Sequence, residues 1–312
     1  MTEQQLLAIR CVVFMLTCLT QTACEPEPVN LAATAEQQSS PATASLGAVT
    51  VNYPLEYFTQ RIGGNSVSAR YPGPANEDPA YWNPDIDTVV DYQQAGLIVL
   101  NGAGYAGWTK RVSLPLAKQI DTSAAFTDRL LAVDNKVAHT HGPTGEHVHD
   151  DLAFTVWLDP ELAGMQADAI HAALVARLPE HRDALAGNLV ALKEELDALD
   201  TELAQVFAAR DERQIIYSHP VYQYLDRRYA LDGISMHWEP DELPSEQEFA
   251  ALESQSGALM LWEAEPLQGT RARLTAMGIK SVVFDPCATQ PESGDYLDVM
   301  RANIQRLETT LP

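Results

Sequence analysis

The sequence predicts an α/β fold of two small lobes, each built on a mainly parallel sheet, joined by one long backbone helix with a cleft between them. Short β-rich runs alternate with longer helical patterns, which is typical of parallel strands linked by crossover helices. One long amphipathic stripe interrupts this alternation near the middle of the chain. The 312 residues, 46% of them apolar, are enough to bury a substantial core.

The first 24 residues have the features of an export signal. Arg10 precedes an apolar stretch, Cys11 to Ala23, that is too short to span a bilayer. The small residues before Cys24 are similar to a bacterial lipoprotein cleavage site, after which that cysteine carries lipid. Gln21 departs from the pattern, so ordinary cleavage after Ala23 stays open. We expect an extracytoplasmic protein, anchored to an inner or outer membrane through Cys24 or soluble in the periplasm.

Residues 25–46 are rich in Pro, Ala, Ser and Gln without periodicity, which predicts a flexible tether. Cys11 and Cys18 fall in the expected leader and Cys24 would carry lipid. Only Cys287 then stays in the folded body, so we expect no intramolecular disulfide and a buried, unreactive thiol there.

Seven β-rich runs place an N-terminal lobe at residues 47–178 and a C-terminal lobe at residues 210–312. The expected strands are Ala48–Tyr53, Ser66–Tyr71 and Leu97–Gly102 in the first lobe, and Arg213–Ser218, Gly233–Trp238, Ala258–Glu263 and Ser281–Pro286 in the second. Ligands of open α/β sheets bind beyond the carboxyl ends of the strands, so residues at strand ends are candidates for a site.

The long helix is expected at residues 179–209. Leucines recur from Leu185 to Val206 in alternating steps of four and three, which puts one apolar stripe along the helix. We interpret the helix as a rigid strut between the lobes of a monomer. A coiled-coil dimerisation helix is the alternative.

Charge and missing motifs exclude several functions. A formal charge of −23 and a pI near 4.5 disfavour nucleic acid as a partner and favour small cations, although acidity also keeps an exported protein soluble. The sequence holds no nucleophile elbow, no phosphate-binding glycine loop and no H-E-x-x-H pair. These absences remove the common hydrolase and nucleotide-enzyme interpretations.

The segment 139–151, HTHGPTGEHVHDD, predicts metal binding. It holds four of the chain's eight histidines, namely His139, His141, His147 and His149. Neutral imidazole is a good zinc ligand, and a Gly- and Pro-containing backbone lets several imidazoles converge on one ion. A solvated loop has no packing reason to be so rich in histidine.

Five further candidates follow strands of the C-terminal lobe. His219 and Asp285 end two expected strands, where they are positioned to bind an ion in the cleft. The alternatives are a capping or core histidine and an ordinary turn aspartate. Glu263, Glu239 and His237 are candidates to complete the coordination shell or to hold an imidazole in place.

Four stretches resemble the metal-specific solute-binding proteins of ABC importers, a family that includes zinc-uptake and manganese-uptake lipoproteins. They are VTVNYPLEYFTQRIGG, LIVLNGAGYAGW, FTVWLDPELA and SHPVYQYLDRRYAL, and the resemblance covers residues 47–312. It implies the two-lobed fold with a backbone helix that limits lobe movement.

The resemblance also implies a four-ligand metal site, of which two ligands carry over. His219 and Asp285 match a histidine and a carboxylate of the family, but the other two family histidines fall at Ala80 and Thr155. Because zinc needs about four ligands, other groups must replace them. We expect the histidines of segment 139–151 to do so, with His147 and His149 best placed because they lie nearest to Thr155 in sequence.

The expected function is therefore non-enzymatic: capture of Zn²⁺ and delivery to an ABC importer permease. Mn²⁺, Cu²⁺ and Ni²⁺ are the alternative ions, Mn²⁺ the least suited to a histidine-rich site. The alternative functions are a metallohydrolase with an open zinc site, and a metal-storage or adhesion lipoprotein without a permease.

Overall fold

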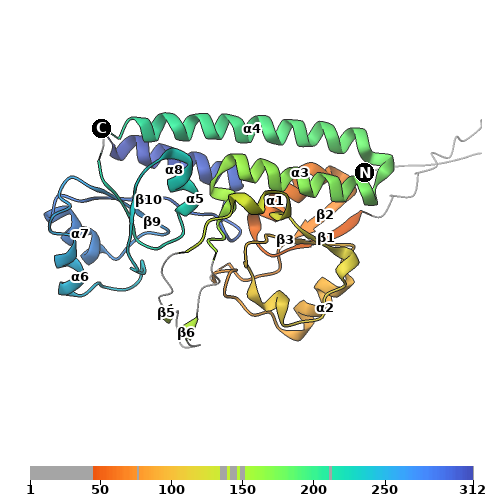
Figure 1. Cartoon of the computed structure of the whole chain (residues 1–312), viewed down its shortest axis with the longest axis horizontal. Coiled ribbons are helices and arrows are strands. Elements are labelled where there is room, and N and C mark those ends of the chain that lie inside the picture. The colour runs from red at the N-terminus through yellow and green to blue at the C-terminus, as the bar shows by residue number, and fades with distance from the viewer. Residues whose placement is uncertain are drawn as a thin grey trace, which may run out of the picture. The chain divides into compact units, whose positions relative to one another are not determined.

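Two parallel sheets of four strands each carry the fold (Figure 1). The computed structural model describes residues 45–75, 77–133, 139–140, 146–147, 152–210 and 213–311, and those from 45 onward belong to one compact unit. The expected export signal, Cys24 and nearly all of the expected tether lie outside these residues. In the described part of the chain no helix is long and apolar enough to cross a membrane.

The N-terminal sheet has the strand order β2-β1-β3-β4, with all neighbours parallel. Its elements are β1 (Leu46–Thr50), α1 (Tyr53–Gly63), β2 (Val67–Arg70), α2 (Ile86–Gln94), β3 (Leu97–Leu100) and β4 (Gln119–Asp121). The apolar run of β3 is almost wholly buried, as expected of a central strand covered on both faces. Asn52 starts α1 immediately after β1 by accepting a hydrogen bond from the Leu55 N–H.

The C-terminal sheet has the order β10-β9-β7-β8 and is also parallel. Its elements are β7 (Ile215–Tyr217), α5 (Gln223–Tyr229), β8 (Ile234–Ser235), α6 (Glu246–Ala251), β9 (Leu259–Trp262), α7 (Gln268–Ala276), β10 (Lys280–Val283) and α8 (Tyr296–Thr310). Every residue of β7 and β9 is buried, so this pair forms the centre of the lobe.

Helices α3 (Pro160–Arg177) and α4 (Arg182–Ala208) separate the two sheets in sequence. α4 packs against α1 and α3 of the first lobe and against α8 of the second, and Figure 1 shows it running along both. Most of the predicted apolar stripe, from Leu185 to Val206, is buried within this chain. Burial of the stripe against both lobes of the same chain favours the strut over the coiled-coil alternative.

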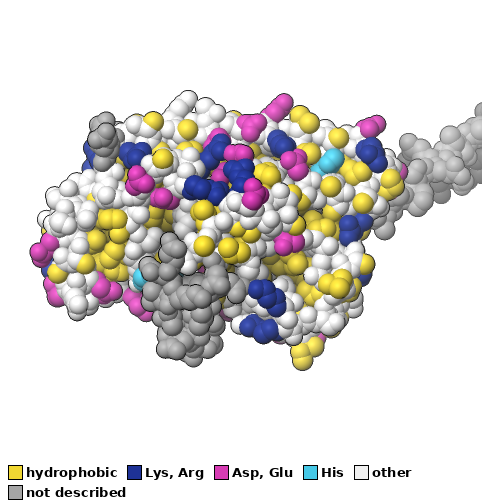
Figure 2. Space-filling view, viewed as in Figure 1, with side chains coloured by type: hydrophobic (Ala, Val, Ile, Leu, Met, Phe, Trp, Pro, Cys, Tyr) yellow, Lys and Arg dark blue, Asp and Glu magenta, His cyan; other side chains and the backbone are white. Residues whose placement is uncertain are grey.

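An ionic network also joins the lobes. Asp159, 1% exposed, caps α3 and lies within 4 Å of Arg129, Arg227 and Arg228, the last two from α5. Glu161 adds ion pairs with Arg129 and Arg228. Figure 2 shows basic and acidic side chains gathered over the region of α3 and α5. The cluster ties the start of α3 to the C-terminal lobe.

Strand boundaries differ from the sequence prediction in one consistent way. The run expected as Leu97–Gly102 ends as a strand at Leu100, because Gly102 and Ala103 have positive φ and turn the chain. The run expected as Ala48–Tyr53 is a strand only to Thr50, because α1 already begins at Tyr53. The fourth N-terminal strand, β4, was not predicted, since its three residues show no pattern.

Candidate functional site

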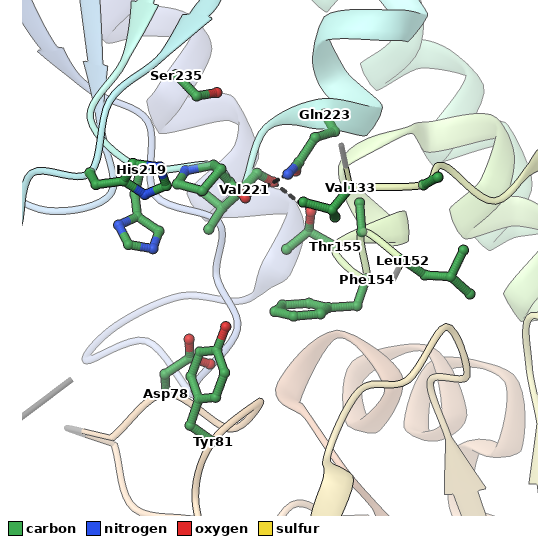
Figure 3. A pocket seen from close by; sticks show the side chains of 14 residues that line it. Asp78, Tyr81, Val133, Leu152, Phe154, Thr155, His219, Val221, Gln223 and Ser235 are labelled. Atoms are coloured by element: carbon green, nitrogen blue, oxygen red, sulfur yellow. Dashed lines mark hydrogen bonds between the residues drawn. The ribbon is translucent and has the colours of Figure 1, made fainter. Parts of the chain in front are cut away.

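Two adjoining cavities lie where residues of both lobes meet. The first has a volume of about 250 Å³ and the second of about 460 Å³. Both are lined by Asp78, Phe154, Thr155 and Val221. The first also contacts His219 and His237, and the second Glu263 and Asp285. Figure 3 shows the first cavity, with Asp78 and Tyr81 on the side opposite His219.

His219 follows β7 and is 6% exposed. The strand end is held by two backbone bonds, from Ser218 N–H to Leu261 and from Trp238 N–H to Ser218. The second bond brings the segment after β8 alongside His219. As a result Nδ1 of His219 lies 3.5 Å from Oε1 of Glu239, and its ring stands edge-on to that of His237 at 5.8 Å. These three predicted residues therefore lie together.

Glu263 and Asp285 follow β9 and β10. Burial, followed by the negative charges of Asp78, Glu239 and Asp285, raises the pKa of Glu263 to about 8. Burial also raises the pKa of Asp285, while a hydrogen bond from the Cys287 N–H (2.7 Å) and the charge of Arg306 lower it. Carboxylates crowded in this way favour a bound cation, because a positive charge stabilises their ionised forms.

Asn303 of α8 fixes the backbone of Asp285. Its amide oxygen accepts from the Asp285 N–H at 2.9 Å, and its amide nitrogen donates to the Asp285 carbonyl at 2.8 Å. Asp285 thus occupies an ordered turn, as the alternative sequence interpretation expected. A turn aspartate can still present its carboxylate to the cavity that it lines.

The two positions at which the resemblance implies family histidines differ from each other. Thr155 lines both cavities, and its hydroxyl donates to the Val221 carbonyl of the other lobe. Ala80 is 9% exposed and lines neither cavity, whereas its neighbours Asp78, Pro79 and Tyr81 each line at least one. The side chain of Thr155 thus reaches both cavities, whereas that of Ala80 reaches neither.

Segment 139–151 is described only in part. His141 and His149 lie outside the described residues, and for His139 and His147 only the backbone is described, in two short antiparallel strands, β5 (His139–Thr140) and β6 (Glu146–His147). His139 pairs opposite His147 in that register. In the described part of the chain, residues 131–133 precede this segment and residues 152–153 follow it.

The two flanks of this segment are joined at a neck beside the first cavity. The Ala153 N–H donates to the Leu131 carbonyl, and Ala132 and Leu152 form a β-bridge. The hydroxyl of Tyr224, from α5, donates to the Ala153 carbonyl (2.9 Å) and accepts from the Leu131 N–H (3.2 Å). Since α5 begins just after His219, the C-terminal lobe holds the neck close to that imidazole.

Among the described residues, no three His, Cys, Asp or Glu side chains are arranged to hold one metal ion. The structure brings His219, His237 and Glu239 together and places Glu263 and Asp285 on the adjoining cavity. Cys287 is buried, and burial raises the pKa of its thiol, which agrees with the unreactive role expected for it.

Comparison with known proteins decides the family. Residues 48–310 match the family described as ZnuA, the periplasmic component A of a zinc-uptake complex. The chain belongs to the ZnuA family. This membership confirms the resemblance stated from the sequence, and the two-lobed α/β architecture agrees with it.

Two relatives of this ZnuA family member come from Streptococcus pneumoniae. The zinc-binding lipoprotein AdcA of serotype 4 is 25% identical over 320 residues, which covers 98% of the chain and 60% of AdcA. The chain therefore spans about three fifths of that relative's length. The manganese ABC transporter substrate-binding lipoprotein PsaA is 27% identical over 89% of the chain and 92% of PsaA.

The fold agrees with a solved relative of the ZnuA family. The crystal structure of the Zn(II)-bound ZnuA-like domain of Streptococcus pneumoniae AdcA superposes with a TM-score of 0.72 at 21% identity, covering 86% of this chain and 99% of that domain. This likeness establishes the shared fold.

Sequence reasoning missed Asp78 and Tyr81, which line the first cavity from the N-terminal lobe. Both belong to the stretch EDPAYW, in which the resemblance implies a ligand only at the position of Ala80. The available signal was a carboxylate two residues before that position, in a turn-forming Asp-Pro pair.

Proposed function

We propose that this chain is an extracytoplasmic solute-binding protein, not an enzyme, that captures a divalent metal and delivers it to an ABC importer permease. The family match over residues 48–310 carries this proposal. The names of the relatives AdcA and PsaA, a zinc-binding lipoprotein and a manganese ABC transporter substrate-binding lipoprotein, support it. The cleft supports it too, because imidazoles and crowded carboxylates suit a cation.

Zn²⁺ is the proposed substrate, with Mn²⁺, Cu²⁺ and Ni²⁺ as alternatives. A site that combines imidazole with carboxylate matches the ligand types of zinc. Mn²⁺ prefers oxygen ligands, so each additional histidine moves the preference away from it.

The proposed ligands are His219, Asp285 and histidines of segment 139–151. His219 and Asp285 line adjoining cavities. His147 and His149 are the preferred partners, with His139 and His141 as further candidates. The neck held by Tyr224 supports this assignment, because it holds Leu131 and Ala153, which flank the segment in sequence, close to the cavity that His219 lines. Glu239, His237 and Glu263 would orient these ligands or add to them.

The membrane anchor, the oligomeric state and the domain bounds complete the proposal. We propose that Cys24 carries the lipid that anchors the chain to the membrane, that residues 25–46 form the tether, and that the mature chain acts as a monomer beside the permease. Residues 47–178 and 210–312 would be the two lobes, joined by residues 179–209.

Calorimetric titration of the metal-free mature chain with Zn²⁺ tests the function and the ligand set together. The wild type is compared with a variant in which His139, His141, His147 and His149 are all alanine, and with His171→Ala as the control, since His171 lies on α3. We expect tight binding by the wild type and the control, and much weaker binding by the fourfold variant. Equal affinity of all three would overturn the ligand assignment, and a wild type that binds no metal would overturn the function.

A further inference from the structure

Asp78 lines both cavities of the cleft, and no other Asp or Glu among the described residues does so. It belongs to the N-terminal lobe, whereas His219, Glu263 and Asp285 belong to the C-terminal lobe. Figure 3 shows it facing His219 from the opposite wall of the first cavity. A group in this position can contact an ion that the other lobe also contacts.

The carboxylate of Asp78 is held in a defined turn. Its Oδ1 accepts from the Ala80 N–H at 2.8 Å, and its backbone carbonyl accepts from the N–H groups of Tyr81 (3.0 Å) and Trp82 (2.9 Å). The ring of Tyr81 packs edge-on against Phe154 at 6.2 Å. A carboxylate has about four acceptor positions, and one of those of Asp78 caps the turn.

The surroundings of Asp78 favour a cation. Asp78 and Glu263 line the second cavity together, so their carboxylates repel each other when both are ionised. Tyr105, 6% exposed, also lines the second cavity and adds a buried hydroxyl beside these carboxylates. The described linings of both cavities contain no Lys or Arg. A positive charge beside these carboxylates would relieve the repulsion.

We propose that Asp78 is a ligand that the N-terminal lobe supplies to the captured metal, in place of the imidazole that the resemblance implies at Ala80. This rests on the proposed function. Ala80 has no donor atom and lines neither cavity, while Asp78 brings an oxygen into both from the same turn. A carboxylate is a harder ligand than the imidazole it would replace. The difference in affinity between Zn²⁺ and Mn²⁺ should therefore be smaller than at a site with that imidazole.

Asp78→Asn tests this ligand, because asparagine keeps the oxygen that caps the turn and loses the charge. The control is Asp87→Asn, which removes an exposed charge from α2 of the same lobe. Metal-free mature chains are titrated with Zn²⁺ by calorimetry and loaded with Co²⁺ for absorption spectroscopy. We expect Asp78→Asn to lose at least about tenfold in Zn²⁺ affinity, the loss typical even of groups that only support a ligand. Its Co²⁺ bands should shift, and those of Asp87→Asn should not.

A rescue variant separates ligation from simple loss of charge. Adding Ala80→His to Asp78→Asn supplies an imidazole at the family position, so part of the Zn²⁺ affinity should return. An Asp78→Asn chain with wild-type affinity and an unshifted Co²⁺ spectrum overturns the proposal while the wild type's own binding upholds the proposed function. A wild type that binds neither ion overturns both.

Discussion

Nδ1 of His219 lies 3.5 Å from Oε1 of Glu239. A carboxylate beside one nitrogen of a histidine fixes the ring orientation and raises the basicity of the other nitrogen. We therefore expect Nε2 of His219 to bind the metal, with Glu239 orienting the ring. The neighbouring His237 stands edge-on to the same ring and narrows its freedom to turn.

Glu239→Gln should weaken Zn²⁺ binding by about 10- to 100-fold, the cost typical of removing a carboxylate that supports a metal-binding histidine. The variant keeps the size of the side chain and loses its charge. Calorimetric titration measures the change. Glu242→Gln is the matched control, because Glu242 is exposed in the same segment. Equal affinities of the two variants would show that Glu239 does not support His219.

Tyr224→Phe should weaken Zn²⁺ binding and lower stability. It removes the hydroxyl that bridges Ala153 and Leu131 at the neck of segment 139–151. Leaving such backbone groups without partners costs about 1–3 kcal/mol. Denaturant unfolding measures the stability of the metal-free protein, and calorimetry measures the affinity.

The control for this prediction is Tyr92→Phe. The Tyr92 hydroxyl also bonds a backbone carbonyl, that of Thr50, but it does so within the N-terminal lobe. We expect Tyr92→Phe to lower stability and leave Zn²⁺ affinity unchanged. If both variants lose affinity equally, the effect comes from general destabilisation and the neck has no special role.

Most of the fold could be predicted because its elements have strong local patterns. The buried runs at Leu97 and Leu259 and the leucine stripe of α4 each define one element. Strand ends were harder, since positive φ at Ala103 depends on how the turn packs and not on residue type. β4 was missed because three residues cannot show a period.

The site could be predicted only where it follows strand ends. His219, Asp285 and Glu263 were found in this way, and the structure places them on adjoining cavities. Asp78 was missed because it lies in an irregular turn, where its position depends on bonds to Ala80 and on the packing of Tyr81. These contacts arise from tertiary packing, so no periodic pattern in the sequence predicts them.

Asp159→Ala should destabilise the protein by about 3–5 kcal/mol, because it leaves three arginines without their shared buried partner. It also removes the cap of α3. Asp159→Asn should cost less, since asparagine keeps the capping oxygen and burial raises the pKa of Asp159 despite the arginines. Urea unfolding at neutral pH measures the loss of stability in both variants and checks that Asp159→Ala loses more. Equal losses would show that the capping oxygen contributes nothing beyond the charge.

Glu263→Gln should make the metal-free protein more stable at pH 8.5 and leave it nearly unchanged at pH 5. The pKa of Glu263 is raised from 4.5 to about 8 in the folded chain. The unfolded chain therefore loses this proton first, so the stability that Glu263 contributes is present below pH 4.5 and is lost as pH rises toward 8. The slope cannot exceed about 1.4 kcal/mol per pH unit for one proton. Glutamine carries no such proton.

Unfolding by urea at several pH values, with a chelator present, checks this difference. Glu253→Gln is the control, because Glu253 is exposed on the same lobe and its replacement should give no pH-dependent gain. Saturating Zn²⁺ should cancel or reverse the advantage of Glu263→Gln, since a bound cation favours the ionised carboxylate that glutamine cannot supply. A constant difference across the pH range would mean that Glu263 ionises in the folded protein as it does in water, and that the carboxylates of the cleft do not repel one another.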